Sequence, residues 1–91
     1  MAKKYNVYEE LRQNGFERDV PMWEGYHELV RYWKDGYREL TVHIVFSPDK
    51  ELLKVMYFNG FREPFKVKNH LNQKRAFNAI RQTVENNSFT F

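Results

Sequence analysis

The chain has 91 residues, of which 42% are hydrophobic and 18% aromatic, so it can build a buried core and is expected to form one domain over residues 1–91. It contains no cysteine, which excludes disulfide bonds, thiol nucleophiles and thiolate metal sites. The formal net charge is +3; residues 60–91 hold six Lys or Arg against two Asp or Glu, whereas residues 1–59 hold nine against ten. The excess positive charge therefore lies in the C-terminal third.

The first predicted element is a short helix over residues 7–14. Its apolar positions recur at helical spacing and are Val7, Tyr8 and Leu11. Asn6 and Glu9 form the pattern of a helix cap at its start. Residues 17–25 follow as a loop, because proline and glycine interrupt them, and we expect Trp23 to pack this loop against the core.

A β-hairpin is predicted around Asp35-Gly36, because two-residue hairpin turns favour this dipeptide. In that register Leu29 faces Val42 and Glu28 faces His43. The second strand, "LTVHIVF", alternates apolar and polar residues, and the buried side of the hairpin comprises Leu29, Leu40, Val42 and Ile44. A helix is the alternative for the first half, since helical spacing is also shown by Trp23, Tyr26, Leu29, Val30 and Trp33. We favour the hairpin.

Two more strands are predicted next. The segment "SPDKE" has the composition of a turn, and "LLKVMYF" is the third strand. Asn59-Gly60 predicts a second tight hairpin, after which "FREPFKV" returns as a short fourth strand. Pro64 cannot donate a backbone hydrogen bond, so this strand is expected at an edge.

The last predicted element is a helix that starts at Asn69 or Asn72 and ends near Asn86 or Asn87. Its buried stripe comprises Ala76, Phe77, Ile80 and Val84. The closing "SFTF" is interpreted as either a frayed end or a short strand, and its two phenylalanines argue against a fully solvated tail.

The order α-β-β-β-(β)-α predicts a small two-layer α+β domain in which the N- and C-terminal helices pack on an antiparallel sheet. This order resembles that of the double-stranded-RNA-binding domain. One local match is "QKRAFNAI", in which Lys74 and Arg75 stand at the start of the last helix, as the phosphate-facing basic pair of that family does. The resemblance implies contact with RNA phosphates. The ending of three strands and a helix also resembles the small N-terminal arm domains of phage integrases.

The sequence carries no recognisable catalytic, metal or cofactor motif. The histidines, His27, His43 and His70, are too far apart for a local metal site and are expected to be structural or on the surface. The two serines lie outside any nucleophile motif, and the four glycines form no phosphate-binding loop. Glu51 and Lys54 do not have the spacing of the nuclease motif that "SPDKELLK" is similar to. We therefore expect no enzyme activity and no cofactor.

The sequence also shows no pattern typical of a targeting or membrane-spanning segment. The N-terminus lacks the apolar core of a secretory signal, and no window approaches the roughly 18 apolar residues of a membrane span. A cytoplasmic protein that does not enter a membrane is expected.

The first functional hypothesis is a small nucleic-acid-binding module. Its binding surface would be a basic patch formed by the C-terminal strand and helix, comprising Arg62, Lys66, Lys68, Lys74, Arg75 and Arg81. Phe61 or Phe65 would add a stacking surface if exposed. The alternative is that these aromatic residues are core and the basic residues are their solvated neighbours.

The second hypothesis is a protein-interaction or inhibitor module of the kind that phages and mobile elements encode, including self-association. Its anchors would be surplus aromatic residues, namely Trp23, Tyr26, Tyr32, Trp33, Phe89 and Phe91. The direction of these side chains discriminates between the hypotheses. An exposed apolar patch favours a protein partner, and a continuous basic stripe over buried rings favours DNA or RNA.

Overall fold

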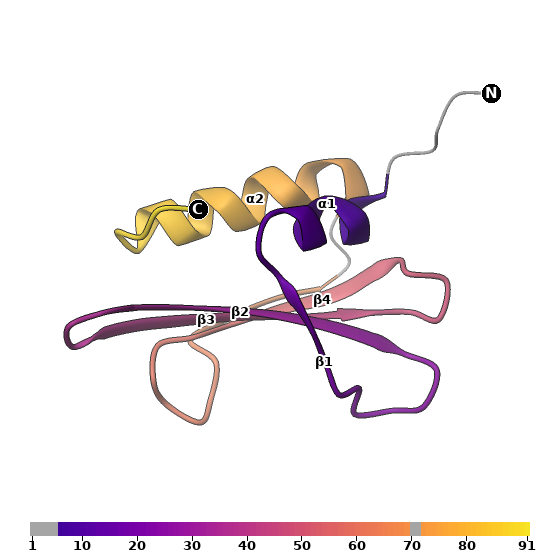
Figure 1. Ribbon diagram of the computed structural model, residues 1–91, viewed down its shortest axis with the longest axis horizontal. Helices are drawn as coiled ribbons and strands as arrows, with labels where there is room; N and C mark the ends of the chain where they lie inside the picture. Colours follow the sequence, from indigo (N-terminus) through magenta and orange to yellow (C-terminus); the bar gives the residue numbers. More distant parts are fainter. Residues whose placement is uncertain (1–5, 70–71) are drawn as a thin grey trace.

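The computed structural model describes residues 6–69 and 72–91 and is a two-layer α+β fold. Its elements are α1 (Val7–Gln13), β1 (Glu17–Asp19), β2 (His27–Asp35), β3 (Arg38–Phe46), β4 (Leu52–Phe58), β5 (Lys66–Asn69) and α2 (Gln73–Asn86). The strands form one antiparallel sheet in the order β1-β2-β3-β4-β5. Both helices lie on the same face of this sheet (Figure 1). The predicted fold class is confirmed, with five strands.

The core lies between the helices and the sheet. Period-two alternation in the strands and helical spacing in α1 and α2 bring apolar side chains to this interface. Its fully buried members include Leu11, Phe16, Leu29, Leu40, Val42, Ile44, Phe46, Val55, Tyr57, Ile80 and Val84. Burial raises the pKa of the Tyr57 hydroxyl, and the neighbouring Thr83 hydroxyl has a smaller opposite effect.

Side-chain caps define the start of each helix. The Asn6 Oδ1 atom accepts hydrogen bonds from the backbone N–H groups of Tyr8 and Glu9, which confirms the predicted cap of α1. Asn72 caps α2 by accepting from the Lys74 N–H, which selects the second of the two predicted caps. The predicted buried stripe of α2 is confirmed by the burial of Ala76, Ile80 and Val84, with Phe77 partly buried against the core.

The predicted hairpin is confirmed and the helical alternative is wrong, but the register differs. Gly36 and Tyr37 form the turn, so Asp35 pairs with Arg38 and Leu29 pairs with Ile44. Gly36 has φ 61° and Tyr37 is not among the residues with positive φ, as expected of a turn with glycine at its first central position. The pairing moves by two residues, so the side chains keep their predicted faces.

The loop predicted over residues 17–25 is wrong in two respects. Residues 17–19 form β1, which pairs with β2 at the sheet edge. Three polar residues show no strand alternation, so the sequence pattern does not reveal this strand. Trp23 does not pack the loop down, because it is 57% exposed.

The tight hairpin predicted at Asn59-Gly60 is also wrong. A seven-residue loop over 59–65 follows β4, and β5 begins after Pro64, whose missing N–H prevents earlier pairing. The edge position of β5 is confirmed. Gly60 has φ 97°, a backbone conformation that strains any residue with a Cβ atom, so glycine is favoured at this position.

The C-terminal segment is neither frayed nor a strand. Phe89 and Phe91 pack against the core cluster, and the Trp33 indole N–H donates to the Thr90 carbonyl at 2.9 Å. The Arg31 guanidinium donates to the Phe91 carbonyl at 3.1 Å and lies 4.4 Å from the centre of the Trp33 ring. The segment is therefore part of the hydrophobic core.

Candidate binding surface

One face of the sheet has no covering layer. Both helices lie on the opposite face, and over residues 6–69 and 72–91 no helix or strand packs against the free face (Figure 1). Apart from Glu28 and Val45, the buried residues of β2, β3 and β4 point toward the helices, so their neighbours along each strand point to the free face. We call this surface the open face. Its side chains include Val30, Tyr32, Thr41, His43, Met56, Phe58 and Val67.

Two loops project on the same side as the open face, as Figure 1 shows. Loop 20–26 joins β1 to β2 at one end of the strands, and loop 59–65 joins β4 to β5 at the other end. They therefore stand at diagonally opposite corners of the sheet. Large apolar side chains on them are exposed: Met22 is 75%, Trp23 57% and Phe61 74% accessible. Such side chains around an apolar sheet face are typical of an interaction surface.

A buried acid–imidazole contact lies at the base of loop 20–26. Glu28 is only 5% exposed, and its Oε2 atom accepts a hydrogen bond from the Met22 backbone N–H. His43 Nε2 lies 2.6 Å from Glu28 Oε1 and 3.9 Å from Asp19 Oδ2. That nitrogen has no hydrogen bond of regular geometry among the described residues. The cluster fixes the loop to the sheet.

The sequence predicted the Glu28–His43 contact between directly opposed residues, but the structure forms it in another way. His43 pairs with Val30 in the observed register, and Glu28 pairs with Val45. The two side chains meet diagonally across the strands, which lies within reach of long side chains on one face. His27 is half-buried beside Tyr8, and His70 lies outside the described residues.

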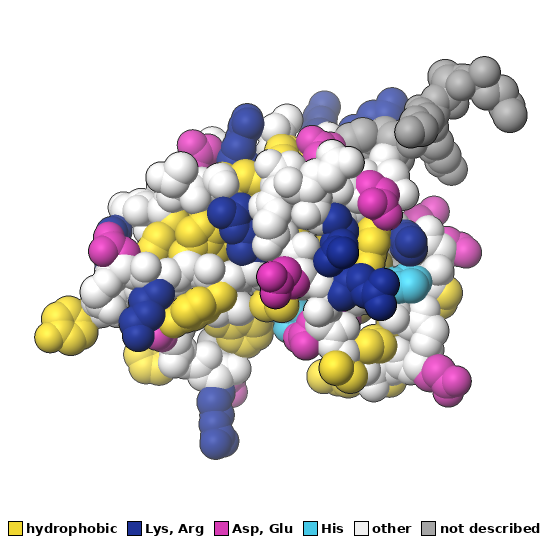
Figure 2. Space-filling view, in the orientation of Figure 1, with side chains coloured by type: hydrophobic (Ala, Val, Ile, Leu, Met, Phe, Trp, Pro, Cys, Tyr) yellow, Lys and Arg dark blue, Asp and Glu magenta, His cyan; other side chains and the backbone are white. Residues whose placement is uncertain are grey.

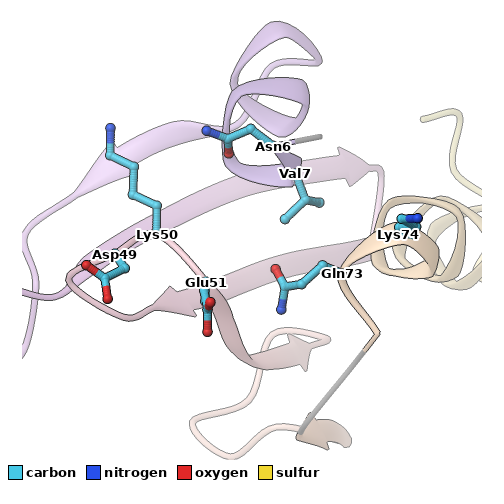
Figure 3. Close-up of a pocket in the computed structure, with 7 residues that line it drawn as sticks. All are labelled: Asn6, Val7, Asp49, Lys50, Glu51, Gln73 and Lys74. Atoms are coloured by element: carbon cyan, nitrogen blue, oxygen red, sulfur yellow. The ribbon is translucent and has the colours of Figure 1, made fainter. Parts of the chain in front are cut away.

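A surface cleft of about 490 Å³ lies between α1, the β3–β4 turn and the start of α2 (Figure 3). Its lining residues are Asn6, Val7, Asp49, Lys50, Glu51, Gln73 and Lys74. Structural hydrogen bonds occupy two of its polar side chains, since Asn6 caps α1 and Gln73 bonds both the N–H and the carbonyl of Leu52. The cleft is a seam between these elements, and its charged lining residues are Asp49, Lys50, Glu51 and Lys74.

The predicted basic residues do not form one surface. Lys74 and Arg81 share a stripe of α2, whereas Arg75 lies about 100° around the helix from Lys74. Arg81 Nε is 3.7 Å from Glu85 Oε1. Lys and Arg side chains alternate with acidic ones over the face seen in Figure 2.

The remaining basic residues belong to other parts of the molecule. Lys66 lies at the β5 edge, where its ammonium contacts the Thr83 hydroxyl at 3.4 Å, and Lys68 is exposed on the same strand. Arg62 is exposed on loop 59–65. The six residues therefore occupy a loop, a strand edge and two sides of a helix.

The predicted aromatic anchors divide into two groups. Trp23 and Tyr32 are exposed and Tyr26 is half-buried. The Tyr32 hydroxyl donates to Glu39 Oε1 at 2.7 Å, and this bond raises the Tyr32 pKa. The exposure expected for the other three is corrected, since Trp33 is 9% exposed and the Phe89 and Phe91 rings pack on the core.

Sequence reasoning missed the apolar side chains of the open face, chiefly Val30, Met56, Phe58 and Val67. The second set of strand positions mixes apolar residues with charged ones such as Glu28, Glu39 and Lys54. Its apolar members were the available signal, because a solvated sheet face normally carries polar residues.

The described residues include no helix long and apolar enough to cross a membrane. Within the same part of the chain, no group of three or more His, Asp or Glu side chains is arranged to hold a metal ion. Comparisons with protein-family models, with curated proteins and with solved structures find no match for this chain.

Proposed function

We propose that the chain is a non-enzymatic protein-interaction module that binds its partner on the open face of the sheet. The observation that carries this proposal is the sheet face that no helix covers, on which Tyr32 and Val67 are exposed, flanked at two corners by the exposed Met22, Trp23 and Phe61. Aromatic and methionine side chains are enriched in the centres of protein interfaces. The surface suits a partner that buries apolar area.

The charge of the open face disfavours nucleic acid there. Four acidic residues point to this side, Glu17, Asp19, Glu28 and Glu39, against two lysines, Lys34 and Lys54. Phosphate groups would be repelled by these carboxylates, and affinity for nucleic acid depends mainly on Lys and Arg contacts. The basic residues predicted for a phosphate-binding patch are dispersed, which weakens that hypothesis further.

The test compares two variants that each carry two alanine substitutions. The loop variant carries Trp23→Ala and Phe61→Ala, and the basic variant carries Lys74→Ala and Arg75→Ala; all four side chains are exposed. Proteins captured by the tagged wild type are identified by mass spectrometry, purified and titrated against each variant by calorimetry. The wild type and both variants are also titrated with labelled DNA and RNA at two salt concentrations.

The expected result is a protein partner whose affinity falls at least about tenfold in the loop variant and is unchanged in the basic variant, a loss of about 1.4 kcal/mol. Salt-sensitive binding of nucleic acid that the basic variant abolishes and the loop variant retains would contradict the proposal. That outcome would return the function to the C-terminal basic residues.

A further inference from the structure

We propose that the open face binds a second copy of this chain, giving a symmetric dimer in which the two sheets pack face to face between outer helix layers. This inference rests on the proposed function and names its partner. Three properties of the surface support it: the placement of the loops, the distribution of apolar side chains and the distribution of charge.

The loops allow two open faces to approach each other. Loop 20–26 and loop 59–65 occupy one diagonal pair of corners, so the other diagonal pair is free. A two-fold axis that lies parallel to the sheet and along or across the strands places each loop over a free corner of the second copy. Face-to-face packing of sheets about 10 Å apart is then possible without collision of the loops.

The apolar residues match under a two-fold axis that runs along β3. In the observed register, Val30 and Met56 flank His43, and Tyr32 and Phe58 flank Thr41. The axis exchanges β2 with β4 of the second copy, so it sets Val30 against Met56 and Tyr32 against Phe58. Each large apolar side chain of the central strands therefore meets another apolar side chain.

Charge distinguishes this axis from the alternative. The acidic side chains Glu17, Asp19 and Glu28 lie on the β1–β2 side of the open face, with Lys34 at the far end of β2, and Lys54 lies on β4. The axis along β3 sets Glu28 of each copy over Lys54 of the other, with Asp19 one strand to the side, over Asn69. An axis across the strands at the level of His43 would instead place Glu17 against Glu17 of the second copy, and like charges in contact are unfavourable.

The size of the face predicts a weak dimer. Strand spacing and rise give the sheet a projected face of roughly 500 Å². Stable interfaces bury about 800 Å² on each partner, so the two loops must contribute the rest. We therefore expect dissociation in the micromolar range, which concentration-dependent methods detect directly.

Sedimentation velocity over a wide concentration range tests the dimer and its axis. The variants are Lys54→Glu, Asp19→Lys, their combination, and Lys74→Glu as a control with the same charge change on α2. Lys54→Glu should raise the dissociation constant at least about tenfold by placing acidic groups against each other. The combined variant should recover most of the affinity, and Lys74→Glu should match the wild type.

Three results would overturn the dimer: a wild type that remains monomeric at every concentration, equal effects of Lys54→Glu and Lys74→Glu, or no recovery in the combined variant while thermal unfolding shows it folded. A monomeric wild type leaves the proposed function standing if the loop variant of Trp23 and Phe61 still loses a different protein partner. If every captured partner binds that loop variant with wild-type affinity, the proposed function itself is refuted.

Discussion

Removal of residues 88–91 should strongly destabilise the fold, because this segment belongs to the core. The Phe91 ring centre lies 5.3 Å from that of Phe77 and 6.0 Å from that of Phe16. Full burial of a phenylalanine contributes roughly 1.5–3 kcal/mol, so the half-buried Phe89 and Phe91 contribute about 1 kcal/mol each.

The truncation also removes two hydrogen-bond acceptors. The Trp33 indole loses the Thr90 carbonyl, and the Arg31 guanidinium loses the Phe91 carbonyl. Each loss costs about 1 kcal/mol, since both donors are at least partly buried. The free energy of unfolding should therefore fall by about 3–5 kcal/mol, a large part of the roughly 5–15 kcal/mol typical of a domain.

Thermal and urea unfolding of the truncated chain, followed by circular dichroism, measures this loss. We expect a fall in Tm of at least about 12 °C, at 4–8 °C for each kcal/mol in a domain of this size. Thr90→Ala is the matched control, because Thr90 is exposed and offers its backbone carbonyl rather than its side chain. A truncated chain with wild-type Tm would refute the reasoning and leave the segment free to bind a partner.

Three further substitutions test individual contacts. Glu28→Ala removes the acceptor of the Met22 N–H and should lower the unfolding free energy by about 1–3 kcal/mol in urea titrations. Gln73→Ala removes both hydrogen bonds to Leu52 and should cost about 1–2 kcal/mol, because they join α2 to β4. Tyr57→Phe should reduce the loss of stability at alkaline pH. Burial raises the Tyr57 pKa, so its contribution is complete below the ordinary tyrosine pKa of about 10 and is lost as pH rises through the higher folded value.

Exposed residues of the same types provide the controls. Glu24→Ala and Gln82→Ala should leave the unfolding free energy within about 0.5 kcal/mol of the wild type. For the pH experiment, Tyr37→Phe is suitable because Tyr37 is fully exposed. Equal losses in a control and its buried counterpart would show that the assigned contacts do not stabilise the fold. Identical alkaline unfolding of Tyr57→Phe and the wild type would contradict the effect of burial at Tyr57.

Strong local signals predicted most of the fold. The caps, the apolar alternation of "LTVHIVF" and the stripe of α2 each depend on neighbouring residues, so they appear in the sequence alone. The predicted register around Gly36 was wrong by two residues. Asp35 and Gly36 were expected at the two central positions of the turn, but Gly36 and Tyr37 occupy them. β1 was missed since its pairing with β2 is the only reason for its extended shape.

The candidate surface depended on information that the sequence does not contain. Whether an aromatic residue is exposed depends on which layer covers it, and the same type of side chain is buried at Trp33 and free at Trp23. Likewise, Lys74 and Arg75 are adjacent in sequence but point in different directions from α2. Tertiary arrangement is therefore what our proposal of a protein partner is based on, whereas the sequence had placed nucleic-acid binding first and a protein partner second.

Nuclear magnetic resonance spectra of the labelled protein, recorded over about a hundredfold range of concentration, test the central claim most directly. The account predicts concentration-dependent shifts on the open face, at residues such as Val30, Tyr32 and Met56, with α2 unaffected. Shifts confined to α2 and β5, or an open face that is unchanged at every concentration and by every captured protein, would contradict the claim that this face is the binding surface.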